Sequence, residues 1–228
     1  MRPPSIRALA VVSTVGLAVG AASALGSRAH STIAPSLSSS DRVMSPSGTL
    51  DTAVFAGGCF WGIEGVFEHI KGVKSATSGF AGGTTRSPSY EDVSSGETGH
   101  AESVQVVYDP SQVSYPQLLR VFFSVHDPTQ LNRQGPDEGT QYRSAVFYRN
   151  PQQRRVAEAY LAQLRASGLY KAPIVTELSA LDAFYPAEEY HQHYMQLHPT
   201  AAYIVINDAP KVALLKRAFP QLYRDAWQ

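Results

Sequence analysis

From about residue 49 onward, the apolar and polar positions of this chain recur at the spacings of short strands and amphipathic helices. Residues 52–56 form a short apolar run closed by two glycines, a pattern typical of a buried strand. Apolar side chains then follow at the helical spacing i, i+3, i+4 and i+7, at Ile63, Val66, Phe67 and Ile70. This stretch therefore predicts a strand followed directly by a helix.

The same patterns predict the remaining elements. Apolar and alternating runs indicate strands over residues 73–80, 103–108, 144–148 and 174–178. Capping residues and apolar spacing indicate helices after Ser114 and Asn150, and over residues 187–197 and 210–217. Residues 127–141 are polar and contain several glycines and prolines, so we expect a long loop. A loop of that length inside a domain is usually functional.

The order of these elements indicates the fold class. The first six run strand, helix, strand, strand, helix, strand, which matches the ferredoxin-like βαββαβ pattern. That pattern places helices on one face of a largely antiparallel sheet. We therefore expect an α+β fold, a two-layer sandwich with a ferredoxin-like core and an additional C-terminal strand and helices.

The N-terminal region has a different pattern. Residues 1–40 contain no Asp or Glu, and Arg2 and Arg7 precede an uncharged, Ala- and Val-rich run over residues 8–27. A positive end, an apolar run and small residues are typical of a secretory signal. We expect residues 1–29 to be a signal peptide or N-terminal anchor, and the protein to be exported, periplasmic or secreted. A membrane-anchored and an organellar protein are the alternatives.

A Ser- and Pro-rich stretch over residues 30–48 follows the targeting segment. Such a composition offers little apolar surface to bury, so we expect a linker. The folded domain is then expected over residues 49–228, a length that suits a single core.

The composition excludes some classes of function. Lys+Arg and Asp+Glu both number 19, so the formal net charge is zero, and general nucleic-acid binding by counterion release is disfavoured. The one cysteine, Cys59, excludes an internal disulfide, a CxxC redox pair and a cysteine-based zinc site. Any chemistry at Cys59 therefore proceeds without a second cysteine of the same chain.

Cys59 lies between the glycines that end the first predicted strand and the start of the first predicted helix. The unpaired N–H groups of a first helical turn stabilise an anion, so this position predicts a lowered thiol pKa and a thiolate accessible near neutral pH. The alternative is a small buried apolar residue, which is what most free cysteines are. Position alone does not decide between the two.

Five segments carry distinctive residues, namely GGCFWG at 57–62, GHAE at 99–102, HDP at 126–128, GPDEGTQYRS at 135–144 and YPAEEYHQ at 185–192. Over roughly residues 52–206 and in this order, they resemble the signature segments of the peptide methionine sulfoxide reductase A family. Several separated motifs make the resemblance specific. It identifies residues 49–228 as the catalytic domain of a reductase.

The resemblance implies that the protein reduces methionine S-sulfoxide, free or in proteins, to methionine and so repairs oxidative damage. The Cys59 thiolate would attack the sulfoxide sulfur and become a sulfenic acid. Glu102 would donate a proton to the sulfoxide oxygen, provided that burial keeps its carboxyl protonated. Tyr90 and Tyr142 match the two tyrosines of the family and would donate hydrogen bonds to the same oxygen.

Three further residues receive binding roles through the resemblance. Phe60 and Trp61 follow the nucleophile and would form an apolar wall for the substrate's S-methyl group, because sulfur–aromatic contacts are favourable. Asp137 in the long loop matches a family carboxylate that orients substrate or water.

The resemblance also implies that the catalytic site needs no metal and no bound organic cofactor. Many relatives regenerate the sulfenic acid with C-terminal cysteines, but residues 210–228 contain none. We therefore expect an external thiol reductant such as thioredoxin, glutaredoxin or glutathione. The other expected partner is oxidised protein or free methionine sulfoxide. We expect a monomer, with membrane contact only through residues 1–29.

Two other functions remain open at this point. A cysteine hydrolase or acyltransferase would use Cys59 with His100 or His126 as base, and would need that imidazole within hydrogen-bond reach of sulfur. An aromatic-lined peptide-binding module would not need the thiol at all.

The histidines near the C-terminus suggest a metal pair. His191 and His193 lie in the predicted helix 187–197, where positions i and i+2 point about 200° apart and cannot share an ion. We expect His191 instead to be a buried hydrogen-bonding residue near the site, and we expect no metal there.

Overall fold

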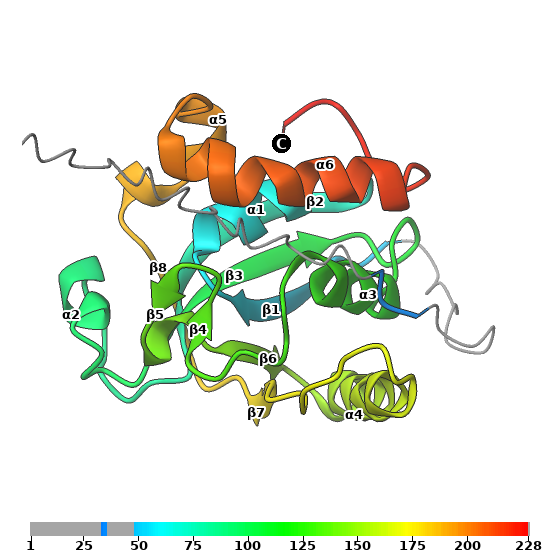
Figure 1. Ribbon diagram of the computed structural model, residues 1–228, viewed down its shortest axis with the longest axis horizontal. Helices are drawn as coiled ribbons and strands as arrows, with labels where there is room; N and C mark the ends of the chain where they lie inside the picture. The colour runs from blue at the N-terminus through cyan, green and yellow to red at the C-terminus, as the bar shows by residue number, and fades with distance from the viewer. Residues whose placement is uncertain (1–32, 36–47, 228) are drawn as a thin grey trace, which may run out of the picture. The chain divides into compact units, whose positions relative to one another are not determined.

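The computed structural model describes residues 33–35 and 48–227 (Figure 1). The predicted signal peptide or anchor, residues 1–29, lies outside the described residues, as does most of the predicted linker. Within the described ranges, no helix has both the length and the apolar character that a membrane crossing requires.

A six-stranded sheet forms the centre of the fold, in the order β7-β6-β1-β3-β2-β8. Neighbouring strands are antiparallel except β6 and β7, which are parallel, so the sheet is mixed. Its strands are β1 (Asp51–Gly57), β2 (Val73–Ala81), β3 (Ala101–Tyr108), β6 (Ser144–Tyr148), β7 (Glu177–Ala180) and β8 (Phe184–Pro186).

The helices connect these strands, and α1, α3, α4 and α6 contribute to one apolar core (Figure 1). They are α1 (Phe60–Glu68), α2 (Tyr90–Ser94), α3 (Tyr115–Val125), α4 (Pro151–Ala166), α5 (Tyr194–Leu197) and α6 (Ala209–Ala218). Short elements complete the described part, namely the hairpin β4 (Arg133–Gln134) and β5 (Asp137–Glu138), the 3₁₀ turns η2 (Thr140–Tyr142) and η3 (Glu189–His191), and the π turn η4 (Ile204–Asp208).

Alternation along the strands separates the two faces of the sheet. In β1, Ala53 and Phe55 face the helices and belong to the large core, whereas Val54 and Ala56 belong to a small cluster on the opposite face. This alternation is what a strand with different surroundings on its two faces requires. The sequence patterns correctly predicted an α+β fold with this strand and the helix that follows it.

The predicted N-cap residues, Ser114 and Asn150, lie at the starts of two helices. The Asn150 side chain accepts a hydrogen bond from the Gln153 N–H (2.8 Å), with Pro151 as the first residue of α4. At α3, the Gln117 side chain accepts from the Ser114 N–H (2.8 Å). Both contacts satisfy N–H groups that a helix start would otherwise leave unpaired.

The predicted helix over residues 187–197 is wrong. The chain instead forms the 3₁₀ turn η3, then an extended Gln192 and a left-handed His193 (φ 54°), and only then the short α5. The reason is a tertiary contact. The Gln192 side chain accepts from the Ser78 N–H and donates to the Ser78 carbonyl of β2, both at 3.0 Å. These hydrogen bonds to β2 hold Gln192 in an extended conformation and so prevent the continuous helix that the apolar spacing predicted.

Two other regions differ from the predicted pattern. The strand expected over residues 174–178 lies later, as β7, and β8 was not predicted. The loop over residues 127–141 contains the β4–β5 hairpin, which brings part of it next to the start of α1.

Ala34 and Pro35, which belong to the predicted linker, contact the folded domain. Ala34 is fully buried, its N–H donates to the Ser124 hydroxyl (3.0 Å), and its carbonyl accepts from Arg120 Nε (3.0 Å). The Pro35 carbonyl accepts from the Tyr160 hydroxyl (3.2 Å). This short segment is therefore attached to α3 and α4.

We expect Phe55→Ala to lower the free energy of unfolding by about 3–5 kcal/mol, measured by urea denaturation. Phe55 is fully buried and stacks with Phe67, Tyr115 and Phe122 at centroid distances of 5.2, 6.1 and 5.0 Å. The control is Leu50→Ala, an exposed position directly before β1, for which a change within about 0.5 kcal/mol is expected. Equal losses in both variants would contradict this account of the core.

Candidate active site

Cys59 is the N-cap residue of α1, directly after the glycine pair that ends β1, and it is 7% exposed. Gly58 has φ +89°, a left-handed conformation that favours glycine, and a Cβ there would lie 2.5 Å from the Gln134 side chain. The tight turn and the approach of the β4–β5 hairpin therefore both depend on Gly58. Together they bury the cysteine at the end of the strand.

Glu102, on β3, lies against the start of α1. Its Oε2 accepts a hydrogen bond from the Phe60 backbone N–H at 3.0 Å, and its side chain is nearly inaccessible to solvent. Burial raises the pKa of this carboxyl to about 8, although the Phe60 N–H favours the charged form, and Asp137 and Asp208 raise the pKa further. At neutral pH the carboxyl is therefore mostly protonated and can donate a proton.

The pKa of the Cys59 thiol differs from the expectation drawn from sequence. Burial, and then the charges of Glu102 and Asp208, raise it well above its ordinary value of 9.0. Lys211 and the Trp61 backbone N–H lower it by less. The predicted lowering by the helix N-terminus is therefore wrong as a net result, because removal of the sulfur from water outweighs the N–H groups of α1.

Aromatic rings surround the first turn of α1. The buried Phe60 ring lies 5.9 Å from Phe80, 6.4 Å from Trp61 and 6.4 Å from Tyr90, measured between ring centroids. Its distance to the His191 ring is 5.2 Å. The two aromatic residues that follow Cys59 therefore share one apolar cluster with Tyr90.

Tyr90 is the first residue of α2. Its backbone N–H donates to Glu188 Oε1 (3.0 Å), and its ring lies 4.3 Å from that of His191. Ser89 caps α2 through a reciprocal capping box with Asp92. Burial and then Glu102 raise the pKa of the Tyr90 phenol, so it remains a hydrogen-bond donor throughout the neutral range.

Tyr142 and Asp137 come from the long loop. Burial raises the pKa of Tyr142, and Glu102, Tyr90 and Cys59 raise it further, which places its phenol within their electrostatic reach. Asp137 Oδ2 accepts a hydrogen bond from the Tyr203 hydroxyl at 2.5 Å. The structure thus brings the predicted site residues of four separate segments to the start of α1.

His191 is buried and hydrogen-bonded near Cys59, as predicted. Its Nδ1 accepts from the Trp61 indole N–H (3.2 Å). Trp61 also stacks on Tyr194 at 3.7 Å and meets the edge of Tyr203 at 5.9 Å. These contacts fix the indole in one orientation beside Cys59.

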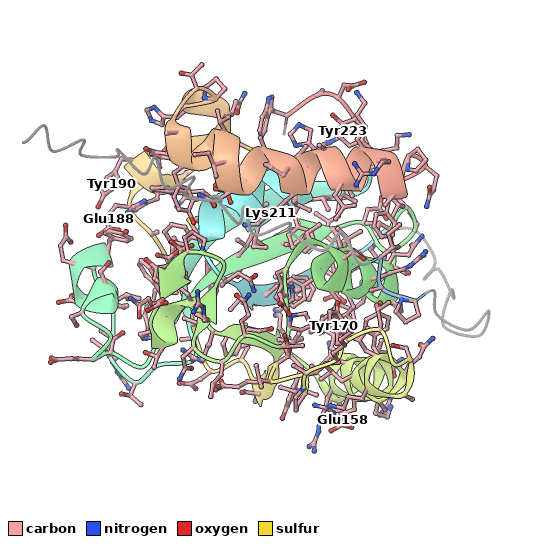
Figure 2. The ribbon with its side chains drawn as sticks, in the orientation of Figure 1. Glu158, Tyr170, Glu188, Tyr190, Lys211 and Tyr223 are labelled. Atoms are coloured by element: carbon pink, nitrogen blue, oxygen red, sulfur yellow. The ribbon has the colours of Figure 1, made fainter. Side chains whose placement is uncertain are left out.

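The sequence did not predict a buried ion pair that lies close to Cys59. The fully buried Asp208 accepts from Lys211 Nζ at 2.8 Å, and both groups act electrostatically on the thiol. Lys211 lies on the side of α6 that faces the sheet (Figure 2). The spacing i, i+3 indicates a pair, but no residue pattern indicates its position next to Cys59.

Gly62 makes this arrangement possible. A Cβ at Gly62 would lie 2.1 Å from Asp208 Oδ1 and 2.8 Å from Lys211 Nζ. Separations below about 3.0 Å do not occur for real Cβ atoms. The glycine that follows Trp61 therefore lets the Asp208–Lys211 pair approach the first turn of α1.

The two histidines considered as bases for a hydrolase have other partners. His100 interacts through Nδ1 with the Gly83 N–H (3.0 Å) and through Nε2 with the Thr85 carbonyl (2.8 Å). His126 interacts through Nδ1 with the Phe122 carbonyl (2.7 Å) and through Nε2 with a serine hydroxyl (2.8 Å). Neither ring has a nitrogen left for the Cys59 sulfur, so this geometry disfavours a hydrolase.

Among residues 33–35 and 48–227, no group of three metal-ligating side chains lies close enough together at Cys59 to share an ion. Among the residues that the structure describes, one group of three such side chains lies close enough to share an ion, and it consists of Glu64, Glu68 and His193. The groups around Cys59 are the Glu102 carboxyl, the phenols of Tyr90, Tyr142 and Tyr203, aromatic rings and a buried ion pair. This set suits proton donation to an oxygen atom and attack by sulfur.

Comparisons with known proteins agree on one family. The sequence model described as "Peptide methionine sulfoxide reductase" matches residues 51–222. A relative from Mesorhizobium japonicum, "Peptide methionine sulfoxide reductase MsrA 2", is 58% identical over 176 residues, covering 77% of this chain and 90% of the relative. A relative of the same description from Synechocystis sp. is 53% identical, covering 77% and 80%.

Solved structures show the same fold. Methionine sulfoxide reductase A of Corynebacterium diphtheriae superposes with a TM-score of 0.60 at 34% identity, covering 72% of this chain and 91% of that chain. Mxr1 from Saccharomyces cerevisiae in reduced form gives a TM-score of 0.57 at 33% identity, covering 67% and 87%.

The electrostatics of the site predict how fast Cys59 reacts with iodoacetamide at pH 8. Lys211→Met is expected to slow alkylation about tenfold, because it removes the cation that favours the thiolate and leaves Asp208 nearby. Asp208→Asn is expected to accelerate it.

The control is Lys216→Met on the same helix, whose ammonium is exposed and pairs with Asp225 at 2.8 Å. It is expected to leave the alkylation rate unchanged. An equal effect of the two lysine variants would show that the buried pair does not act on the thiol.

Proposed function

This chain belongs to the peptide methionine sulfoxide reductase A family and reduces methionine S-sulfoxide to methionine, and we propose that Cys59 and Glu102 carry out the chemical step. One contact carries this assignment. The N–H of Phe60, the residue after Cys59, donates to the buried Glu102 carboxyl at 3.0 Å. The nucleophile and the proton donor are therefore held together by the first turn of α1.

Glu102 acts as the general acid in this proposal. Its carboxyl has a pKa of about 8, so at neutral pH it carries the proton that the sulfoxide oxygen needs as the S–O bond breaks. Tyr90 and Tyr142 hydrogen-bond the same oxygen and stabilise the negative charge that develops on it. The raised pKa values of both phenols keep these donors protonated.

Cys59 acts as the nucleophile. A neutral Glu102 no longer opposes ionisation of the thiol, and the cation of Lys211 offsets part of the opposing effect of Asp208. The Cys59 sulfur attacks the sulfoxide sulfur and forms an S–S bond, while Glu102 protonates the sulfoxide oxygen. The hydroxyl then migrates to the Cys59 sulfur, as both the S–O bond of the substrate and the new S–S bond break. The electron pair stays on the methionine sulfur, and the thiol proton replaces the one lost by Glu102. In sum, a thiol and a sulfoxide become a sulfenic acid and a thioether.

Substrate recognition is assigned to the aromatic cluster. Phe60 and Trp61 offer an apolar wall for the S-methyl group, with sulfur–aromatic contacts as the attraction. The Trp61 indole is held in place by His191 and Tyr194. Asp137 orients Tyr203, whose ring stands nearly perpendicular to that of Trp61 at 5.9 Å, and so supports this wall as well.

Regeneration of Cys59 is assigned to an external thiol. Cys59 is the only cysteine of the sequence, so the sulfenic acid has no resolving partner in the same chain. A first external thiol forms a mixed disulfide with Cys59 and releases water, and a second attacks that disulfide and restores the Cys59 thiol. Thioredoxin, glutaredoxin and glutathione are thiols of this class.

We also propose the organisation of the whole chain. Residues 49–228 form the reductase domain, which the family match over residues 51–222 supports. The order β6-β1-β3-β2, with antiparallel neighbours, supports a ferredoxin-like core with β7 and β8 added at its edges. The Arg-containing, apolar start of the sequence supports export, in which case the reductant acts outside the cytosol.

Cys59→Ser is expected to abolish reduction of methionine S-sulfoxide, because a serine hydroxyl replaces the only thiol of the chain. The measurement is epimer-resolved chromatography of free methionine sulfoxide with dithiothreitol as reductant. Near-UV circular dichroism shows that the variant is folded. Turnover by a folded Cys59→Ser protein would remove Cys59 from the mechanism.

Glu102→Gln is expected to lower kcat/KM about 10²–10⁴-fold, because the amide still accepts the Phe60 N–H but supplies no acidic proton. In the wild type, the contribution of Glu102 to kcat/KM is lost as pH rises through about 8, where the carboxyl ionises. The residual activity of the variant is expected to lack this decline. A pH profile over that range tests both expectations.

Unfolding measurements separate this role from simple damage to the fold. The unfolded chain loses the Glu102 proton near pH 4.5 and the folded one near pH 8, so the stability linked to this proton is present below 4.5 and falls as pH rises to 8. Glu102→Gln is therefore expected to be more stable than the wild type at pH 8, by about 2–5 kcal/mol. The control, Glu158→Gln on the surface of α4, should change neither activity nor this pH dependence (Figure 2).

A further inference from the structure

A second cluster of polar groups lies on α1, away from the catalytic residues. Glu64 and Glu68 are one helical turn apart, and each is only 1% exposed. His193, from the segment between η3 and α5, lies against them, and one ligand atom from each residue lies within 4.8 Å of the others. Two carboxylates and an imidazole from distant parts of the sequence therefore converge on one point.

The hydrogen bonds of this cluster leave two carboxylate oxygens unused. Glu64 Oε2 accepts from the His193 backbone N–H (3.1 Å), and Glu68 Oε1 contacts His193 Nδ1 (2.5 Å). Glu64 Oε1 and Glu68 Oε2 are buried and have no hydrogen-bond partner within 3.5 Å, although the Ser78 hydroxyl lies close enough to Glu64 to lower the pKa of its carboxyl. The nearby Arg224 guanidinium donates to the backbone carbonyl of Glu68 instead.

Buried carboxylate oxygens without a partner are costly, because they lose hydration and gain nothing in exchange. Within the described residues, the only salt bridge to either carboxylate is the contact of His193 with Glu68. Whenever both carboxyls are ionised, the cluster offers more negative charge and more acceptor atoms than its neighbours satisfy. A cation at the convergence point would satisfy both.

We propose that Glu64, Glu68 and His193 bind a divalent transition-metal ion, of which Zn²⁺ fits best. Two carboxylate oxygens and one imidazole nitrogen form a mixed set suited to a cation of intermediate hardness, and zinc sites with three protein ligands complete their coordination with water. The His193 side chain is 43% exposed, which leaves a route for the ion and the water from solvent.

The proposed ion links His193, in the segment that follows η3, to α1. His193 adopts a left-handed backbone (φ 54°), and two residues earlier His191 accepts the Trp61 indole hydrogen bond. A metal bond at His193 therefore holds the segment that orients Trp61. The site stands apart from Cys59, which is not a ligand, and the proposal does not depend on the mechanism proposed for the reductase.

The test is a titration of untagged, EDTA-treated full-length protein with Co²⁺, whose visible absorption reports coordination, followed by displacement with Zn²⁺. We expect one equivalent of Co²⁺ to bind, and about 100 µM Zn²⁺ to raise the unfolding temperature by about 5 °C. The Cys59→Ser protein is titrated in parallel and should bind the same equivalent. Loss of binding in that protein would mean that the thiol is a ligand, and would overturn the proposal.

Two ligand variants and one control complete the test. Glu68→Gln and His193→Gln are expected to weaken Co²⁺ binding at least about a hundredfold, since each removes one of three ligands. His193→Gln changes a partly exposed side chain and is expected to fold, so it decides the outcome if Glu68→Gln does not. His198→Gln, at an exposed histidine of the same region, should bind like the wild type.

Absence of a one-equivalent Co²⁺ signal in the wild type would overturn the proposal. A proton held between the two carboxyls would then be the explanation of their burial. Unchanged binding in His193→Gln would overturn it as well, by placing the ion elsewhere.

Discussion

The structure depends on the hydrogen bond between the Phe60 N–H and the buried carboxyl of Glu102. This bond joins the first turn of α1 to the middle strand β3, and it holds the proposed proton donor beside the proposed nucleophile before substrate arrives. Burial is what makes the carboxyl useful, because a solvated glutamate would be ionised at neutral pH. The same burial, however, also makes ionisation of Cys59 harder.

The buried Asp208–Lys211 pair belongs to this balance. A lysine without a partner could hardly be kept charged at such a depth, and Asp208 supplies that partner at 2.8 Å. The pair has little net charge, and because Asp208 acts on the thiol more strongly than Lys211 does, the pair as a whole raises the pKa of Cys59. Gly62 controls the approach of the pair, since any side chain there would collide with Asp208. Gly62 thus affects the pKa of Cys59 indirectly, because the absence of a side chain lets the ion pair approach the thiol.

The sequence predicted what depends on local signals. Alternation in β1, helical spacing in α1 and the Asn150 cap required only neighbouring residues, and the motifs around Cys59 and Glu102 identified the family. The sequence did not predict the features that depend on tertiary contacts. The bonds of Gln192 to Ser78 broke the expected helix after residue 187. The predicted direction of the pKa shift of Cys59 was wrong, because the start of a helix can be recognised in the sequence whereas the depth of burial of the thiol cannot.

Burial of Cys59 also affects how long the enzyme survives its own chemistry. A sulfenic acid exposed to peroxide is oxidised further to sulfinic acid, which is irreversible in most proteins, and susceptibility follows exposure and anionic character. Cys59 is 7% exposed, and its surroundings disfavour a negative charge on sulfur. The intermediate is therefore shielded from a second oxidation while it waits for an external thiol. With Cys59 as the proposed nucleophile and no second cysteine in the sequence, this shielding takes the place of the rapid disulfide formation that a resolving cysteine would provide.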